Sequence, residues 1–336
     1  MTSQTTPTHV PPRTDPPTAR PGWGAWLGPL GVATIATAVS VVAPLLSPLL
    51  VCLVVGAVVA NSPARRRVPM AASAEAAKFL LRLGIVGLGL RLSVAEVAEV
   101  GLLGVGVVVV TVAFTFRTTQ YVGRRMGLEH DLVDLVAAGF SICGAAAVAA
   151  VQDSVGARRS NAALAVALVT LFGTLMMVVL PVAGDLLGLS GEQTSLWVGA
   201  SIHEVAQVVA ATALVGSGSL AVAMSVKLGR VLMLVPVHHA VMRGSVHTDS
   251  RRAGVPWFLW GFLAAVAVRS TGLVPEVGLV AGQWASTLVL GAGMYGLGLG
   301  LAARELWPVP ARALALAAYA TAVVTLVPLG FVLLAR

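Results

Sequence analysis

The sequence predicts an all-α fold, a polytopic bundle of membrane helices that contains inverted repeats and two broken or re-entrant segments. The first reason is composition: 57% of the 336 residues are hydrophobic and 11% are charged, against about 25% charged residues in soluble domains. The second is a succession of long apolar runs, and the third is a glycine-serine motif that two of those runs share. This composition excludes a soluble enzyme, a nucleic-acid-binding protein and a secreted disulfide scaffold.

Residues 1–22 differ from the rest, because prolines alternate there with threonine and serine. Such a stretch neither forms a helix nor buries a core, so we expect a disordered tail. It is not a signal peptide, because the apolar run that follows it is too long. The chain therefore divides into a cytoplasmic tail, residues 1–22, and a transmembrane transporter domain, residues 23–336.

Each predicted membrane segment is an apolar run close to the ~20 residues that a spanning helix needs. The second run is short, so one broken element over residues 27–60 is an alternative. No connection is long enough to hold a soluble domain, and the function is therefore expected inside the bundle. The predicted segments are residues 27–46, 48–60, 71–90, 98–116, 132–152, 160–182, 194–214, 220–242, 255–270, 277–302 and 311–335.

Basic residues predict the orientation, since Lys and Arg are enriched in cytoplasmic loops. With a cytoplasmic N-terminus most of them fall inside, among them the run Arg65–Arg67. Arg158 and Arg159 break this pattern if segment 132–152 crosses the membrane fully. They fall inside if 132–152 enters and returns to the cytoplasm, while 194–214 enters from the outside and returns there. Two full crossings are the alternative, because the charge rule is statistical.

Those two segments also resemble each other, which indicates an internal repeat. A single span separates them, so two re-entrant hairpins would enter from opposite faces, as in the inverted repeats of many secondary transporters. A weaker echo pairs residues 87–92 with 296–301, and there the glycines favour close helix contacts. The matching stretches of the main repeat are Gly139-x-Ser141-Ile142-x-x-x-Ala146-x-Val148-x-Ala150 and Gly199-x-Ser201-Ile202-x-x-x-Ala206-x-Val208-x-Ala210.

The small residues of the repeat indicate an anion site. Irregular backbone is tolerated in a bilayer where protein or water satisfies it. A broken helix presents free N–H groups at the positive end of its dipole. Ser141, Gly144 and Ser201 would let a ligand approach that backbone. We therefore expect these three residues to contact the substrate.

Ionisable residues inside the spans point to the same region, because charges in a membrane segment usually face a cavity. Lys227 and Arg230 lie three positions apart on one helix face and would supply positive charge for an anion. Glu204 is the only acidic residue well inside a predicted span. It or the adjacent His203 would carry a coupling proton, since imidazole titrates near neutral pH, and Gln207 lies one turn further along. The alternative is a structural ion pair between Glu204 and Lys227.

Two enzyme motifs nearly fit the sequence. The stretch from His203 to Gln207 is similar to the His-Glu-x-x-His helix of metalloproteases, but Gln207 replaces the second histidine, so that zinc site is not formed. The stretch around Ser141 is not the Gly-x-Ser-x-Gly elbow of serine hydrolases, and no ATP-binding loop is present. We therefore expect no enzyme, no metal site and no cofactor, with a membrane-embedded hydrolase as the least favoured alternative.

The resemblance to a known family lies in residues 139–145, 199–211 and 227–231. These stretches resemble the YeiH family of bacterial inner-membrane sulfate exporters. The resemblance covers about residues 27–334 but not the tail, and the run Ser-Ile-His-Glu-Val-Ala-Gln is highly specific. The family looks related to cation–proton antiporters and anion transporters with inverted repeats and broken helices. The chain departs from it at Ala146, where the family often has serine, so one hydroxyl that could contact an oxyanion is missing.

The resemblance implies a secondary transporter of the plasma membrane, the bacterial inner membrane, that exports a small inorganic anion such as sulfate. Together with the residues above, it predicts a multi-pass protein with a cytoplasmic N-terminus and proton-coupled anion export. A cation–proton antiporter that uses Glu204 is the alternative. The expected partners are the anionic solute and the lipid bilayer, not nucleic acid. The oligomeric state, a homo-oligomer included, is left open.

Overall fold

The computed structural model describes residues 23–42, 48–95, 101–215, 220–244, 256–299 and 310–335, and these residues form helices and no strand. The all-α prediction is therefore confirmed, while the predicted tail lies outside the described residues. The α-helices are α1 (Trp23–Val42), α2 (Pro48–Asn61), α3 (Met70–Leu88), α5 (Gly101–Arg125), α6 (His130–Ser141), α7 (Ala145–Gln152), α8 (Arg159–Leu186), α9 (Gly191–Ser201), α10 (Val205–Val215), α11 (Leu220–Leu232), α12 (Leu234–Gly244), α13 (Trp257–Ser270), α14 (Glu276–Leu299) and α16 (Ala311–Leu334). Two short 3-10 helices are η1 (Pro63–Arg67) and η2 (Gly89–Arg91).

Within the described residues, six stretches are long and apolar enough to cross a membrane. Several predicted segments differ in extent from the observed helices: α1, for example, begins at Trp23 rather than at residue 27. Segment 98–116 continues as α5 to Arg125, because the first left-handed glycine after it is Gly127, with φ +69°. Segment 220–242 is interrupted at Met233, between α11 and α12.

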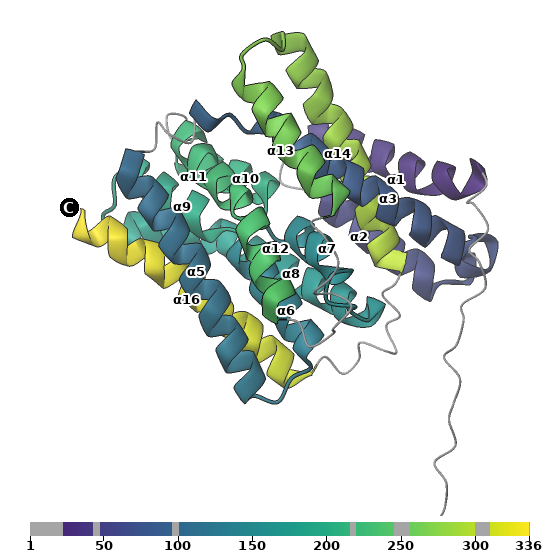
Figure 1. Ribbon diagram of the computed structural model, residues 1–336, viewed down its shortest axis with the longest axis horizontal. Helices are drawn as coiled ribbons and strands as arrows, with labels where there is room; N and C mark the ends of the chain where they lie inside the picture. Colours follow the sequence, from purple (N-terminus) through teal and green to yellow (C-terminus); the bar gives the residue numbers. More distant parts are fainter. Residues whose placement is uncertain are drawn as a thin grey trace, which may run out of the picture.

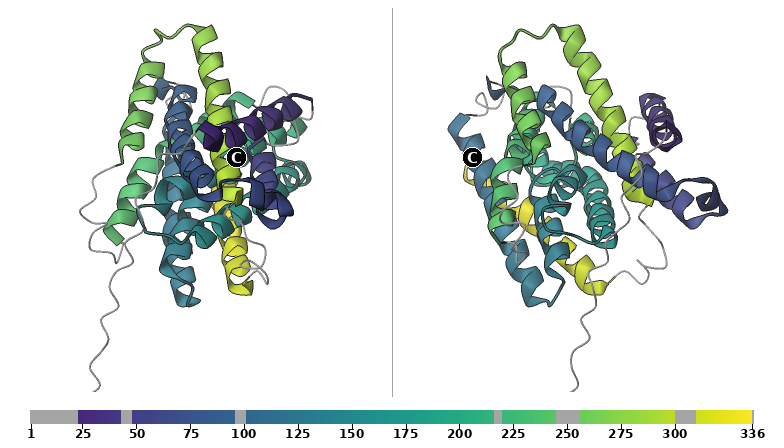
Figure 2. Two further views of the ribbon diagram at one scale, coloured as in Figure 1. Left: turned by 90° about the vertical axis from the view of Figure 1, so that its right-hand side faces the viewer. Right: turned by 45° about the vertical axis from the view of Figure 1, so that its right-hand side comes forward.

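The helices form two groups that meet along one boundary (Figure 1). The first group contains α1, α2, α3, α13 and α14, which pack mainly on one another. The second contains α5 to α12 and α16. Figure 2 shows the α13–α14 pair of the first group rising above the other helices in both views. We call the first group the scaffold group and the second group the hairpin group.

Close backbone contacts hold the scaffold group together. A Cβ atom on Gly56 of α2 would lie 2.2 Å from the carbonyl oxygen of Tyr295, and one on Gly298 would lie 2.2 Å from that of Leu53. Gly87 likewise faces the side chain of Ser286. We expected the glycines of the weaker echo, residues 87–92 and 296–301, to lie at close helix contacts. This is confirmed for Gly87 and Gly298.

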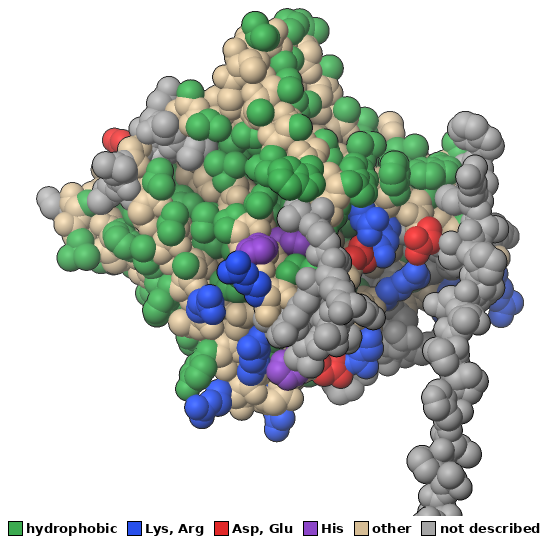
Figure 3. Space-filling model, in the orientation of Figure 1, with side chains coloured by type: hydrophobic (Ala, Val, Ile, Leu, Met, Phe, Trp, Pro, Cys, Tyr) green, Lys and Arg blue, Asp and Glu red, His purple; other side chains and the backbone are tan. Residues whose placement is uncertain are grey.

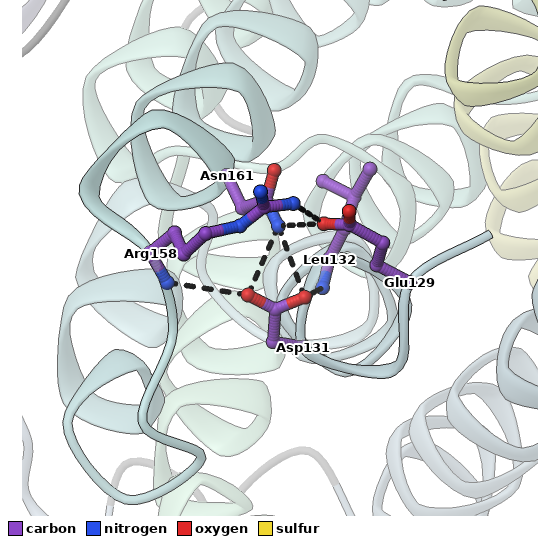
Figure 4. Close-up of polar contacts among 5 residues, drawn as sticks. All are labelled: Glu129, Asp131, Leu132, Arg158 and Asn161. Carbon is purple, nitrogen blue, oxygen red and sulfur yellow. Dashed lines mark hydrogen bonds and ion pairs between the residues drawn. The ribbon is translucent and has the colours of Figure 1, made fainter. Parts of the chain in front are cut away.

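The first repeat segment is a re-entrant hairpin. α6 and α7 pack against each other, and the start of α6 lies beside the start of α8 (Figure 4). There the side-chain nitrogen of Asn161 donates to both carboxylate oxygens of Asp131, at 3.0 and 2.9 Å, and to Glu129 at 2.7 Å. Arg158 pairs with Glu129, and its backbone N–H donates to Asp131. The chain thus returns to the face that it left, and the hairpin interpretation of 132–152 is confirmed.

The second repeat segment is also a hairpin, and it enters from the opposite face. α8, a 28-residue crossing helix, leads directly to α9. The end of α10, at Leu214 and Val215, lines the same surface cleft as Asp185 at the end of α8 and Gly191 at the start of α9. The two hairpins therefore enter the bundle from opposite faces, which is the inverted arrangement that the repeat predicts.

Basic residues gather on one face of the molecule. The start of α8 shares that face with the end of α5, and Arg312 at the start of α16 donates to the carbonyl oxygen of Met126 there. Figure 3 shows the Lys and Arg side chains in the lower half of the view, while the upper half is mainly apolar. We call the face that carries these basic residues the arginine-rich face. The hairpin of α9 and α10 enters from the opposite face. Arg158 and Arg159 thus lie with most of the other arginines.

Candidate functional site

The tips of the two hairpins meet inside the bundle. α6 ends at Ser141 and α7 begins at Ala145, and Gly144 between them has φ +73°, a left-handed conformation that favours glycine. A Cβ atom on Gly144 would lie 3.1 Å from Cγ of Glu204, in the second tip. Glycine at this position therefore permits both the left-handed backbone of the turn and the close approach of the two tips.

Lys227 and Arg230, both fully buried on α11, bind the backbone of both tips. The Lys227 ammonium donates to the carbonyl oxygens of Ile142 at 3.1 Å and Ile202 at 2.8 Å, and to that of His203. An ammonium has three N–H donors, so all three are used. These carbonyl groups lie at the C-terminal ends of α6 and α9, where a helix dipole is negative.

Arg230 completes this arrangement. Its guanidinium makes five hydrogen bonds, equal to its number of N–H donors. The acceptors are the carbonyl oxygens of Phe140 at 3.0 Å, Ser141 at 3.2 and 3.0 Å, Ala200 at 2.7 Å and Ile202 at 3.1 Å. Both basic side chains therefore fix the tips, and their charge remains next to the site although their donors are occupied.

Glu204 lies at the start of α10 and is 3% exposed. The Thr170 hydroxyl donates to Oε1 at 3.4 Å, whereas Oε2 has no hydrogen-bond partner among the described residues. Gln207 holds the turn, because its side-chain oxygen accepts from the backbone N–H of Glu204 at 3.2 Å and its nitrogen donates to the Thr170 carbonyl oxygen and the Thr174 hydroxyl. Glu204 thus presents one unpaired carboxyl oxygen in a buried setting.

The remaining predicted site residues are buried around the tips. The His203 ring lies 4.7 Å from the Phe140 ring, edge to face, and neither ring nitrogen has a hydrogen-bond partner among the described residues. The Ser141 hydroxyl donates to the carbonyl oxygen of Ala138 at 3.3 Å. The Ser201 hydroxyl is buried and has no partner within the same part of the chain. The structure thus brings all eight predicted residues to one place.

A cavity of about 370 Å³ lies between the two helix groups, against the hairpin tips. It has room for a small solute with several waters, each of which takes about 30 Å³. The hairpin tips contribute Glu204 and the N-terminal residues of α7 and α10, whose first N–H groups have no partner within the helix. The cavity walls include Cys143, Ala145, Ala146, Glu204 and Val205 from the hairpins, and Leu88, Arg91, Trp284 and Thr287 from the scaffold group.

Arg91 is the cavity residue that the sequence analysis missed. It follows directly after the predicted segment 71–90, and this position in the sequence indicates a connection between segments. In the structure it ends η2 and lines the same cavity as Glu204. The available signal was the glycine-rich stretch from Gly87 to Leu92, which places an arginine at an irregular helix end.

No group of three or more His, Cys, Asp or Glu side chains among the described residues is arranged to hold a metal ion. The groups that the site presents are a titratable carboxyl, two helix N-termini and the buried basic side chains of α11. These groups can bind and release a charged solute and a proton.

The family comparisons agree with the fold and with the motifs. Residues 27–317 match the family model described as conserved hypothetical protein 698. A UPF0324 membrane protein of Corynebacterium glutamicum is 40% identical over 294 residues, covering 86% of this chain and 85% of its own. One of Pseudomonas putida is 38% identical over 294 residues, covering 81% and 82%. No solved structure matches the chain. The chain therefore belongs to the UPF0324 family of multi-pass membrane proteins, which is the YeiH family that its hairpin motifs resemble.

Proposed function

We propose that the protein is a secondary transporter that carries a small inorganic anion of the sulfate type together with a proton. The observation that supports this most directly is the cavity at the hairpin tips. There the N-terminal ends of α7 and α10 meet the unpaired carboxyl oxygen of Glu204. Helix N-termini are natural binding sites for anions.

The balance of charge around the cavity favours an anion. Three basic side chains lie at or next to the cavity, those of Arg91, Lys227 and Arg230, and Glu204 carries one negative charge when ionised. The C-terminal ends of α6 and α9 and the N-terminal ends of α7 and α10 contribute partial charges of about −0.5 and +0.5 each, which cancel. With all three basic groups charged, the site has a net charge near +2, and near +3 when Glu204 is protonated, so an incoming anion is attracted.

Proton coupling follows from the position of Glu204 on the cavity wall. An ionised carboxylate beside a bound anion would repel it, whereas a protonated carboxyl can donate a hydrogen bond to it. Anion and proton therefore favour each other in the same occupied state. The buried Ser141 and Ser201 and the backbone near Gly144 would complete the anion site.

The hairpin architecture suits alternating access. In transporters with inverted repeats, the binding site lies near the membrane midplane and one helix group moves against the other. Here the cavity lies between the scaffold group and the hairpin group. We further propose that the arginine-rich face is cytoplasmic, as the positive-inside rule expects, in the bacterial inner membrane.

Flux through reconstituted vesicles tests this function. Vesicles with the purified protein are loaded with radiolabelled sulfate or sulfite, with and without a pH gradient, and are compared with protein-free vesicles. We expect protein-dependent anion flux that changes with the gradient. If the protein carries neither of these anions and no other small inorganic oxyanion, the proposal is wrong.

A second function, cation–proton exchange, is favoured by a specific observation: Glu204 is the acidic side chain that lines the cavity among the described residues. A carboxylate that alternates between a proton and a cation would perform this exchange. Adding sodium or potassium salts to vesicles that contain a pH-sensitive dye separates the two functions. Collapse of the gradient by the cation, independent of the anion present, would favour the exchanger.

A further inference from the structure

We infer that Arg91 is the side chain that contacts the transported anion, from the scaffold side of the cavity. The inference rests on the proposed function, and it assigns the role of direct ligand to a residue other than Lys227 and Arg230. The bound anion would then lie between one arginine of the scaffold group and the two helix N-termini of the hairpin group.

The scaffold group holds Arg91 at the cavity wall. One terminal nitrogen of its guanidinium donates to the Thr287 hydroxyl at 2.5 Å and to the Gln283 carbonyl oxygen at 2.8 Å, both on α14. Thr287 also lines the cavity. Two contacts to one neighbouring helix fix the side chain, so its position does not depend on the ligand.

Arg91 also retains donors that the protein does not use. Its Nε is buried and has no hydrogen-bond partner in the described part of the chain. A guanidinium has five N–H donors, and the two hydrogen bonds to α14 both start from the same terminal nitrogen. The other basic groups near the site differ, because Lys227 and Arg230 use all their donors on the hairpin carbonyl groups.

Arg91 differs in its location from Lys78 and Arg82, the basic residues of α3, which lie on the side of the tips that faces the arginine-rich face. Lys78 lies 2.5 Å from Asp153, which follows α7, and Arg82 pairs with the same carboxylate. Lys78 and Arg82 thus share one carboxylate on the side of the tips that faces the arginine-rich face. Arg91 lies at the far end of α3, toward the opposite face, and among the described residues it has no carboxylate partner.

The chemistry of this arrangement indicates an oxyanion. A guanidinium is a planar fork that matches two oxygens of an oxyanion such as sulfate or sulfite. Across the cavity, Glu204 carries an unpaired oxygen that donates a hydrogen bond to the same anion when it is protonated. Because the anion contacts both helix groups, its binding would favour a state in which the groups are close together.

Transport kinetics of charge variants test the inference. Arg91→Gln removes the charge and the fork, Arg91→Lys keeps the charge alone, and Arg269→Gln at the end of α13 is a control outside the cavity. For inorganic sulfate and sulfite, we expect KM to rise about tenfold or more in Arg91→Gln, as expected for the loss of a hydrogen bond to a charged group. We expect a smaller rise in Arg91→Lys and no change in Arg269→Gln. An unchanged KM in Arg91→Gln, with intact wild-type flux, would overturn the inference.

A binding measurement separates this role from a structural one. Cys143 lines the cavity, so in a Cys52→Ala background its alkylation by N-ethylmaleimide reports occupancy. Sulfate should slow the alkylation in the parent protein and not in Arg91→Gln. If Arg91→Gln does not fold, Thr287→Val replaces it, because this variant removes only the hydroxyl that orients Arg91 and should weaken the protection by sulfate.

The outcomes distinguish the two proposals. If the wild-type protein carries no oxyanion and sulfate gives no protection, the proposed function itself is wrong. If sulfate is carried and protects Cys143 equally in the parent, Arg91→Gln and Thr287→Val proteins, the function stands and the assignment of Arg91 fails.

Discussion

The side-chain nitrogen of Asn161 lies 2.9 Å from a carboxylate oxygen of Asp131, although the two residues are 30 positions apart. α6 and α7 lie between them in the chain, so these two helices must leave and return at the same face. The contact therefore fixes the topology of the first hairpin. With the second hairpin entering from the opposite face, it also fixes the inverted symmetry of the site.

Thiol labelling tests this topology. In a background without Cys52 and Cys143, cysteines at positions 124 and 158 should react with a membrane-impermeant maleimide from one side of the membrane. A cysteine at position 192, at the start of α9, should react from the other side. Labelling of positions 158 and 192 from the same side would contradict the hairpin of α6 and α7.

The sequence indicated this topology without deciding it. The shared Gly-x-Ser-Ile motif and the misplaced charges of Arg158 and Arg159 both pointed to re-entrant hairpins. The sequence could not decide between hairpins and full crossings, because an apolar segment of that length fits either. Only the contact between residues far apart in the chain, Asp131 and Asn161, resolves the alternative.

The buried cations of α11 should stabilise the protein strongly. Arg230→Met removes the side-chain donor from the carbonyl oxygens of Phe140, Ser141 and Ala200, and each buried group left without a partner should cost about 1–3 kcal/mol. Arg230→Lys should be intermediate, because an ammonium offers fewer donors. Thermal unfolding in detergent measures the effect. Lys78→Met is the control, since that lysine is 35% exposed and pairs at the surface, where an ion pair contributes about 0–1 kcal/mol.

The sequence identified Lys227 and Arg230 but not their partners. Their acceptors are backbone carbonyl oxygens up to 90 positions away, and a carbonyl carries no side-chain signature. Nor could the pattern show that these donors would be fully used and that Arg91 would be left with free ones. Residue type and depth in the membrane are readable from sequence, whereas hydrogen-bond partners across helices depend on packing.

Glycines at close helix contacts should tolerate no added side chain without a loss of stability. A Cβ atom on Gly199 of α9 would lie 2.3 Å from the carbonyl oxygen of Ala223 on α11. Backbone cannot yield as a flexible side chain does, so Gly199→Ala should push α9 away from α11 and lower the melting temperature. Gly106→Ala in α5 is the matched control, because its Cβ would meet no atom within 4 Å. That variant should be neutral or slightly stabilising, since alanine favours a helix over glycine by about 1 kcal/mol. Equal melting temperatures for the two variants would contradict the packing of α9 on α11.

Ion pairs on the arginine-rich side of the tips join the two helix groups. Asp153 accepts from Lys78 and Arg82 of α3, and Glu75 lies 3.2 Å from Arg159. Breaking these ion pairs should let the scaffold group and the hairpin group separate at the arginine-rich face. We expect Asp153→Asn to speed the alkylation of Cys143 by an impermeant reagent applied from the arginine-rich face.

The matched control for that experiment is Glu129→Gln. It breaks the pair between Glu129 and Arg158, which lies at the same face but wholly within the hairpin group. It should leave the rate of alkylation unchanged. Equal rates for Asp153→Asn and the parent protein would show that the ion pairs do not close the cavity.

The pH dependence of transport should depend on Glu204. If anion and proton bind together, flux of sulfate into proton-poor vesicles should rise as the external pH falls, because a larger fraction of the carboxyl groups is protonated. Glu204→Gln is a permanent mimic of the protonated state and should therefore carry the anion at a rate that no longer varies with pH. Glu192→Gln, at the start of α9 and outside the cavity, should keep the parent profile. A pH-driven flux that persists in Glu204→Gln would remove this carboxyl from the coupling step, and the proton would then have to travel on another group or on the anion itself.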